Sequence, residues 1–343
     1  MTDSAPDPRR NEDPLIRERA VTSYAARRAF RDAIQFPPDV PGVEHAIDLH
    51  CHAHKGQQDP IALARHASRS GMGGLLYKTL DYSVAPMVKM EEIRTALHRW
   101  ADAEQVEPIE CWAGFLTDHW MGGTNHAAVL PQIEAGVRGI WMPTASHANT
   151  VSQVGGRPWW WGASRDPNEL VGPMPMEEAI KQGCMYVLKD GRLDPDVRDV
   201  VALCVEHDVA LFFGHLTHDE QDALAEEIGR QGLRKAVVDH PFSPFVDLSV
   251  PRMKQFTEAG IYLNFTYDEL SPLLGVDPLA MASAIRTVGC DHVTLSSDAG
   301  EPLFPNSVEC MRLMRAYMRA FGLTADEIEQ VTVTNPRTLL GLS

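Results

Sequence analysis

Long apolar runs and positive charge are both scarce in this 343-residue sequence. No run of about 18 apolar residues occurs, the length that a membrane-spanning helix needs, so we do not expect a membrane protein. The 31 basic side chains are outnumbered by 47 acidic ones, and the formal net charge is −16. Nucleic acid and anionic membrane surfaces require a basic patch, so neither is an expected partner. A small anionic substrate is still compatible with this composition, because the charge around a site can be opposite in sign to the net charge of the protein.

Paired cysteines are missing as well. The six cysteines form neither a C-x-x-C pair nor a small-domain disulfide framework; they stand at positions 51, 111, 184, 204, 290 and 310. We therefore expect free thiols and a reducing, cytoplasmic location. Residues 1–8 are polar and acidic, unlike the basic and then apolar pattern of a signal peptide, which favours the same location.

Short apolar or β-branched segments alternate with helix-like segments along most of the chain. We predict strands near 46–52, 73–79, 109–116, 137–142, 208–214, 235–240, 260–265 and 291–297. Helical patterns lie between them, over 58–70, 86–105, 126–135, 194–207, 218–230, 250–258 and 277–288. Eight strands with intervening helices match a (β/α)8 barrel, and the alternation implies a parallel sheet. The predicted fold class is therefore α/β, a distorted TIM barrel.

The expected organisation is one catalytic domain behind an N-terminal segment. Residues 1–44 are predicted to form a tail and a helix, and residues 45–343 the barrel. The alternation breaks between the fourth and fifth strands, where residues 145–193 are expected to form an insertion on the barrel rim. Long loops at that rim carry specificity.

Two features stand out within this insertion. A hairpin is predicted around Asp190-Gly191. Three consecutive tryptophans, Trp159, Trp160 and Trp161, either wall an apolar substrate pocket or pack the insertion onto the barrel or a second subunit. A homo-oligomer therefore stays open as an interpretation.

The first predicted strand ends in two histidines spaced i, i+2, in Ile47-Asp48-Leu49-His50-Cys51-His52. Side chains two apart on a strand point to the same face, so His50 and His52 aim into one space. Two ligands of a single metal ion must converge in this way, and histidine is a common ligand for zinc.

Further polar residues stand where other predicted strands end. The second strand carries Lys78, the fifth ends in His215, the sixth in His240 and the eighth in Asp298. The carboxyl ends of all barrel strands converge on one mouth, so these side chains are expected to share a site. Neutral imidazoles supply ligands without overcharging a divalent ion, and an aspartate can both bind the ion and take a proton from water. This set predicts a metal-dependent hydrolytic centre.

The order H-x-H, Lys, His, His and Asp on successive strands resembles the amidohydrolase superfamily of metal-dependent hydrolases. The segment 334–342, with its Asn-Pro-Arg-Thr-Leu-Leu-Gly-Leu run, is similar to a closing segment common in that superfamily. The resemblance covers about residues 45–342, and the Trp-Met-Pro-Thr (141–144), Gly-His (214–215) and Asp-His-Pro (239–241) motifs are similar to a little-characterised branch of it.

The resemblance implies roles for individual residues. His50, His52 and Asp298 would hold one metal ion, and Asp298 would also carry the proton. His215 and His240 would hold a second ion, or one of them would bind metal while the other orients the substrate. The implied cofactor is one or two divalent ions, of which zinc is the first choice.

One position departs from the family pattern. Binuclear members carry a carboxylated lysine at the end of strand four, where this chain has Trp141-Met142-Pro143-Thr144. Lys78 either takes its place as a metal ligand or meets the substrate as a plain ammonium. Lys189 is a third choice, but its Lys-Asp-Gly context is more typical of a solvated turn.

The resemblance implies hydrolysis of an amide, cyclic amide, lactone or ester of a small molecule, with Asp298, Lys78 and His240 as catalytic residues. A zinc-dependent, non-hydrolytic decarboxylase of the same superfamily is an alternative, as is a non-catalytic, metal-stabilised binding protein. Loop residues near the mouth are candidates for substrate contact: His54, His119, Asn125, His147 and Trp159.

Overall fold

The computed structural model describes residues 42–53, 58–80, 83–156, 171–300 and 304–342. The predicted N-terminal helix, His54 and Trp159–Trp161 lie outside these described residues.

Eight parallel strands form one sheet whose order follows the chain, β1-β2-β3-β4-β7-β8-β9-β10. Their bounds are β1 (Ile47–Ala53), β2 (Gly74–Leu80), β3 (Glu110–Leu116), β4 (Gly139–Trp141), β7 (Ala210–Phe212), β8 (Ala236–Asp239), β9 (Tyr262–Thr266) and β10 (Val293–Ser296). Each lies within or beside a predicted strand, and the predicted (β/α)8 barrel is confirmed.

The barrel is closed where β10 meets β1. The backbone N–H of His52 donates to the carbonyl of Ala299 at 2.8 Å, and the N–H of Asp298 donates to the carbonyl of His50 at 2.8 Å. Below these bonds, the carboxylate of Asp48 accepts from the backbone and the hydroxyl of Ser297, at 3.0 and 2.5 Å. The closure therefore lies beside the histidine pair and fixes Asp298 against β1.

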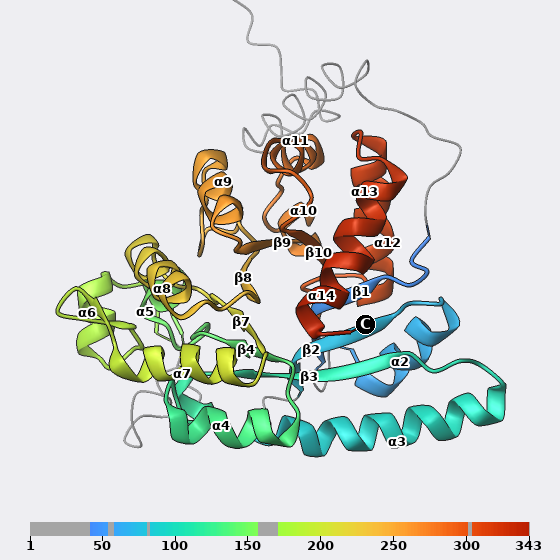
Figure 1. Cartoon of the computed structure of the whole chain (residues 1–343), viewed down its shortest axis with the longest axis horizontal. Coiled ribbons are helices and arrows are strands. Elements are labelled where there is room, and N and C mark those ends of the chain that lie inside the picture. The colour runs from blue at the N-terminus through green and yellow to red at the C-terminus, as the bar shows by residue number, and fades with distance from the viewer. Residues whose placement is uncertain (1–41, 54–57, 81–82, 157–170, 301–303, 343) are drawn as a thin grey trace, which may run out of the picture.

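Helices surround the sheet on its outer side (Figure 1). They are α2 (Pro60–Arg69), α3 (Pro86–Glu104), α4 (His126–Ala135), α7 (Pro195–Glu206), α8 (His218–Gln231), α9 (Val250–Glu258), α11 (Pro278–Val288), α12 (Ser307–Ala320), α13 (Ala325–Glu329) and α14 (Asn335–Leu340). Many begin with a capping side chain: Asn125 of α4, for example, accepts from the N–H of Ala128 at 3.0 Å.

The interval between β4 and β7 holds α5 (Ala148–Val154), α6 (Met176–Lys181) and the two-stranded hairpin β5 (Leu188–Lys189) and β6 (Arg192–Leu193). The two strands pair antiparallel, which confirms the predicted hairpin. Its turn residues Asp190 and Gly191 have φ of 50° and 70°. A type I′ turn requires positive φ at both central positions, and an Asp-Gly pair satisfies that requirement.

Large side chains fill the barrel interior beneath the site. The rings of Trp141 and Phe212 stack at 3.9 Å with an interplanar angle of 8°. Gly114 leaves room for this stack, since a Cβ there would stand 2.4 Å from Cζ3 of Trp141. The packed interior gives the residues at the strand ends a rigid base.

All six cysteines are buried and free, as predicted. Among the described residues, no helix combines the length and the apolar character needed to cross a bilayer.

Candidate metal centre

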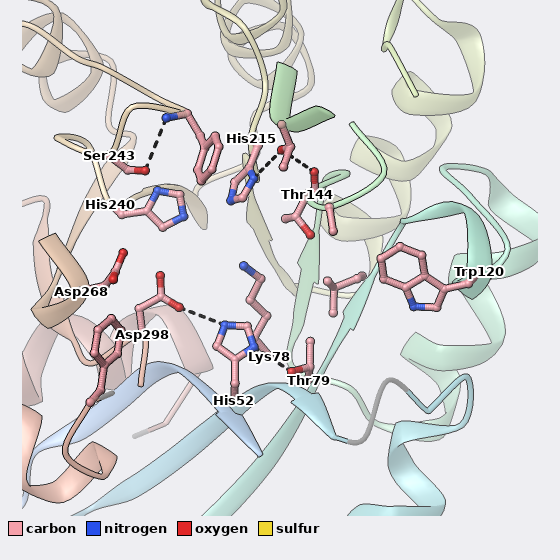
Figure 2. A pocket seen from close by; sticks show the side chains of 15 residues that line it. His52, Lys78, Thr79, Trp120, Thr144, His215, His240, Ser243, Asp268 and Asp298 are labelled. Atoms are coloured by element: carbon pink, nitrogen blue, oxygen red, sulfur yellow. Dashed lines mark hydrogen bonds and ion pairs between the residues drawn. The ribbon is translucent and has the colours of Figure 1, made fainter. Parts of the chain in front are cut away.

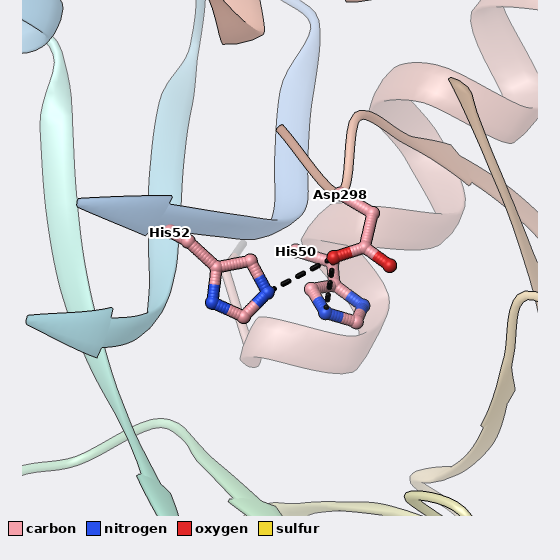
Figure 3. A group of neighbouring side chains, drawn as sticks. All are labelled: His50, His52 and Asp298. Atoms are coloured by element: carbon pink, nitrogen blue, oxygen red, sulfur yellow. Dashed lines mark hydrogen bonds and ion pairs between the residues drawn. The ribbon is translucent and has the colours of Figure 1, made fainter. Parts of the chain in front are cut away.

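His50, His52 and Asp298 converge at the carboxyl ends of β1 and β10. Nε2 of His50 lies 3.0 Å from Oδ1 of Asp298, and Nε2 of His52 lies 2.9 Å from the same oxygen (Figure 3). The three ligand atoms lie within 4.8 Å of one another. Two imidazole nitrogens and a carboxylate oxygen that lie this close together are a suitable ligand set for a divalent ion such as zinc.

Backbone conformation helps to aim the residues after the strands. Asp298 and His240 both have positive φ, 49° and 35°, and Gly214, directly before His215, has φ of 60°. Positive φ is uncommon outside glycine. It persists where the surrounding structure imposes it, and such positions cluster at functional sites. The chain therefore turns sharply after β7, β8 and β10, at the residues that carry the candidate ligands.

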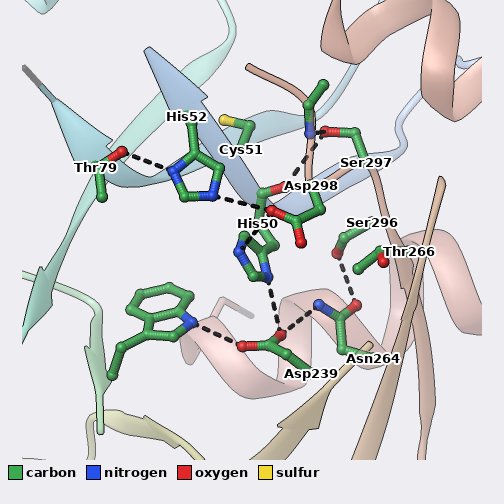
Figure 4. Close-up of polar contacts among 12 residues, drawn as sticks. His50, Cys51, His52, Thr79, Asp239, Asn264, Thr266, Ser296, Ser297 and Asp298 are labelled. Atoms are coloured by element: carbon green, nitrogen blue, oxygen red, sulfur yellow. Dashed lines mark hydrogen bonds and ion pairs between the residues drawn. The ribbon is translucent and has the colours of Figure 1, made fainter. Parts of the chain in front are cut away.

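Asp239 contacts Nδ1 of His50, the ring nitrogen that does not face Asp298. Its Oδ1 lies 3.1 Å from Nδ1 of His50 and accepts from Nδ2 of Asn264 at 2.8 Å (Figure 4). Its Oδ2 accepts from Nε1 of Trp141 at 2.7 Å. A carboxylate on one ring nitrogen fixes the tautomer and directs the other nitrogen forward, as in carboxylate–histidine–metal triads.

The charges of this cluster follow from burial and pairing. Burial opposes a charge on His50, but Asp298 and Asp239 outweigh it and raise the pKa of His50 to about 9. Burial also favours neutral carboxyl groups, yet His50 lowers the pKa of Asp239 to about 2 and holds that of Asp298 well below its usual value. Burial lowers the pKa of His52 to about 3, so this ring is a neutral donor.

His215 and His240 lie beside this compact group. Nδ1 of His215 is 2.8 Å from Oγ1 of Thr150, whose hydroxyl donates to the carbonyl of Thr144 at 2.7 Å. Because the Thr150 hydroxyl has only one proton and donates it to Thr144, Nδ1 of His215 must donate a hydrogen bond to the Thr150 oxygen. Nε2 of His215 then carries the lone pair. Burial lowers the pKa of His215 well below its usual value, which keeps the ring neutral.

The His240 ring stands between the other imidazoles, 5.2 Å from the His215 centroid and 5.9 Å from the His50 centroid. Burial lowers its pKa to about 4. Within the described part of the chain, Nδ1 of His240 is buried without a hydrogen-bond partner. This nitrogen is therefore available to a water molecule or an ion.

A cavity of about 240 Å³ opens over these residues (Figure 2). Its lining comprises His52, Lys78, Thr79, Leu116, Trp120, Thr144, Ala145, Thr150, His215, His240, Ser243, Phe245, Asp268, Asp298 and Phe304. Lys78 thus faces the site. Lys189 does not: it is exposed in the hairpin and forms an ion pair with Asp194 at 2.6 Å.

Three predicted substrate contacts do not line the cavity. His147 is fully buried and uses both ring nitrogens, accepting from the N–H of Asn149 and pairing with Glu220 at 3.0 Å. His119 points to the carbonyl of Gly183 at 2.7 Å, and Asn125 caps α4. Local capping and packing engage polar atoms of all three residues, and their contact with a substrate stays a prediction.

Other residues face the cavity without having been predicted. Trp120 and Phe245 supply apolar surface, and Phe245 stacks on His215 at 4.5 Å. Oγ1 of Thr79 lies 2.7 Å from Nδ1 of His52, at hydrogen-bond distance. Thr79 directly follows Lys78 and Trp120 directly follows His119, so proximity to the predicted residues is the signal that could have found them.

Glu269, in α10 (Tyr267–Leu270), supports the loop after His240. It is fully buried and accepts from the backbone N–H groups of Phe242 and Thr266, at 2.6 and 2.7 Å. Burial raises its pKa from 4.5 to about 8. Between these two values the folded state binds the additional proton, so the free energy of unfolding falls as pH rises through this window.

We expect Glu269→Gln to remove this pH dependence. Urea unfolding at about pH 5 and about pH 9 should show a loss of stability in the wild type that is smaller in the variant by about 1–3 kcal/mol. An equal change in the free energy of unfolding between the two pH values in both proteins would show that Glu269 does not titrate in this window.

A family model matches residues 45–264, well over half of the chain; its description is "Family of unknown function (DUF6282)". The chain belongs to this family. No curated protein matches this DUF6282 chain significantly.

Solved structures share the fold of the DUF6282 chain at low identity. The probable dipeptidase PvdM from Pseudomonas aeruginosa is 12% identical with a TM-score of 0.55, covering 94% of this chain and 98% of that one. An amidohydrolase from Pseudomonas aeruginosa is 12% identical with a TM-score of 0.52 over 87% of this chain and 95% of that one. A metallo peptidase from Rhodobacter sphaeroides is 14% identical with a TM-score of 0.50 over 94% and 96%. These likenesses show that the chain shares the barrel fold of an amidohydrolase, a probable dipeptidase and a metallo peptidase.

Proposed function

We propose that this protein is a metal-dependent hydrolase that cleaves an amide, cyclic amide, lactone or ester bond of a small molecule. The observation that carries the proposal is the convergence of His50, His52 and Asp298 on one point at the barrel mouth, beside an open cavity. The mouth is where barrel enzymes place their active sites. The names of the similar structures add support, since they include an amidohydrolase, a probable dipeptidase and a metallo peptidase liganded with a phosphinate mimic of a dipeptide.

We propose zinc as the metal. His50, His52 and Asp298 would hold it, with Nε2 of His215 and the His240 ring as further donors on the other side of the cavity. Nitrogen and carboxylate donors without thiolates suit zinc and similar ions. When bound, such an ion lowers the pKa of water to about 7 and polarises a carbonyl oxygen.

The chain's own residues supply the remaining chemistry. Asp298 lines the cavity, so its carboxylate can accept a proton from the attacking water and return it to the leaving group. Its low pKa keeps it ionised and therefore able to accept. His240 and Lys78 face the same space and position the substrate. Leu116 and Phe245 exclude water from part of the wall.

Elemental analysis and a substrate panel test the proposal together. We expect the purified protein to contain zinc, and His50→Ala to lose the metal and the turnover of amides, cyclic amides, lactones and esters while circular dichroism shows a retained fold. His98→Ala, which alters an exposed histidine of α3, should keep both.

Two results would contradict the proposal. One is full metal content and turnover in His50→Ala, which would remove His50 from the metal site. The other is release of carbon dioxide without incorporation of labelled oxygen from water, which would indicate a decarboxylase.

We also propose a cytoplasmic location and a small-molecule substrate. Six free, buried cysteines are typical of proteins from reducing compartments. The net charge of −16 disfavours nucleic acid and anionic membranes as partners.

A further inference from the structure

Strand geometry aims Lys78 into the cavity. Tyr77 and Lys78 are neighbours on β2, and neighbouring strand residues point to opposite faces. The Tyr77 hydroxyl donates outward to the carbonyl of Pro60, at the start of α2, at 2.9 Å. Lys78 therefore faces inward, and Figure 2 shows its nitrogen in the space between His52, His215 and His240.

The Lys78 side chain is largely buried, and its amino group opens onto the cavity without an ion pair among the described residues. Its residue is 4% exposed, and within the described residues no hydrogen bond or ion pair involves Nζ. Lys235 provides a contrast inside the same fold: it is 9% exposed, and its Nζ pairs with Asp208 at 2.6 Å. An amino group that opens onto a cavity without a partner there is free to receive a negative group of a ligand.

The cavity groups nearest to this ammonium do not neutralise it. His52, His215 and His240 surround the Lys78 nitrogen in the cavity, and an imidazole carries no negative charge. Oδ1 of Asp298 is already engaged by both histidines of β1. Asp268 and Asp298 line the same cavity, so the positive charge is local to Lys78 and the imidazoles beside it, and a negative group is favoured at that point of the wall.

We propose that Lys78 binds an anionic group of the substrate, a carboxylate or a phosphate, and that the substrate is a small acid. This inference rests on the proposed function, because it names the substrate class of the same site. The apolar wall formed by Leu116, Trp120 and Phe245 suits a short apolar portion beside the anion. The ammonium acts as a point charge that orients the acid relative to the metal ligands.

Matched ligand pairs test this assignment. N-acetylglycine and N-acetylglycinamide differ by one charge at nearly constant shape, and inorganic phosphate probes the other anion. Calorimetric titration into zinc-loaded and into chelator-treated protein separates binding by Lys78 from binding by the metal. We expect at least one of the two anions to bind both protein forms more tightly than the amide does.

The variants are Lys78→Met, Lys78→Arg and, as a control, Lys181→Met at an exposed lysine of α6. Lys78→Met should weaken anion binding by about tenfold to a hundredfold, the usual size of a charged hydrogen bond, and leave amide binding unchanged. Lys78→Arg should recover part of the affinity. Because Lys78 has no partner, Lys78→Met should unfold at the same urea concentration as the wild type or a higher one.

Several outcomes would overturn the inference. They are anion binding unchanged in Lys78→Met, equal affinity for the acids and the amide, or a loss of stability that shows a structural role. A carbamate signal after incubation with ¹³C-bicarbonate, absent in Lys78→Met, would make Lys78 a metal ligand instead. Lys78-dependent anion binding in a protein that holds no metal and shows no turnover would uphold the anion site while refuting the hydrolase.

Discussion

Asp298→Asn is expected to lower turnover by about 10²- to 10⁴-fold, the usual contribution of a positioned proton acceptor. The carboxylate of Asp298 is the negative partner of both His50 and His52. Burial favours its neutral form, but the charge of His50 and the hydrogen bonds from the two rings hold its pKa well below the usual value. Asparagine keeps the size and one oxygen of the side chain but loses the charge and the ability to accept a proton. We therefore expect both catalysis and metal affinity to fall.

The comparison needs kinetics, metal content and stability from one preparation. Asp102→Asn is the matched control, since Asp102 is an exposed carboxylate of α3 that does not line the cavity. If Asp298 moves the proton, kcat should remain low even at zinc concentrations that restore full occupancy. Wild-type kcat in fully loaded Asp298→Asn would show that the carboxylate only binds metal.

The barrel and the convergence of His50, His52 and Asp298 could be predicted because short-range patterns determine them. Alternation with period two placed His50 and His52 on one face, and the convergence of barrel strands placed Asp298 beside them. The observed ligand atoms within 4.8 Å of one another are the geometric consequence. The helices and strands predicted between residues 46 and 297 agree with the observed ones to within a few residues, because apolar periodicity and turn signals are local properties of the sequence.

The support around the site could not be predicted, because it depends on side chains that meet only after folding. Asp239 and Trp141 are 98 residues apart, and their hydrogen bond reflects how the barrel interior packs. The contacts of His147 are a second example. It follows β4 as a site residue would, but Glu220, whose carboxylate also caps α8 through Thr217, takes its ring nitrogen. A position after a strand indicates the mouth of the barrel without indicating where the side chain points.

Asp239→Asn is expected to weaken zinc binding by about 10- to 100-fold, the usual effect of removing a partner behind a metal ligand. The wild-type carboxylate serves three donors: Nδ1 of His50, Nε1 of Trp141 and Nδ2 of Asn264. An asparagine has a single accepting oxygen, and its amide group would face at least one buried donor. That mismatch should also lower the free energy of unfolding by about 1–3 kcal/mol.

The Asp239→Asn/Asn264→Asp double variant separates these two effects. It returns a carboxylate to the network, next to the hydroxyl groups of Thr294 and Ser296 that now donate to Asn264 at 2.9 and 2.7 Å. Urea unfolding should therefore recover part of the lost stability. Zinc affinity, measured against a competing chelator, should stay low, because the charge no longer lies against Nδ1 of His50. Wild-type affinity in either variant would show that His50 needs no carboxylate behind it, and the buried pair would then serve the barrel core rather than the metal.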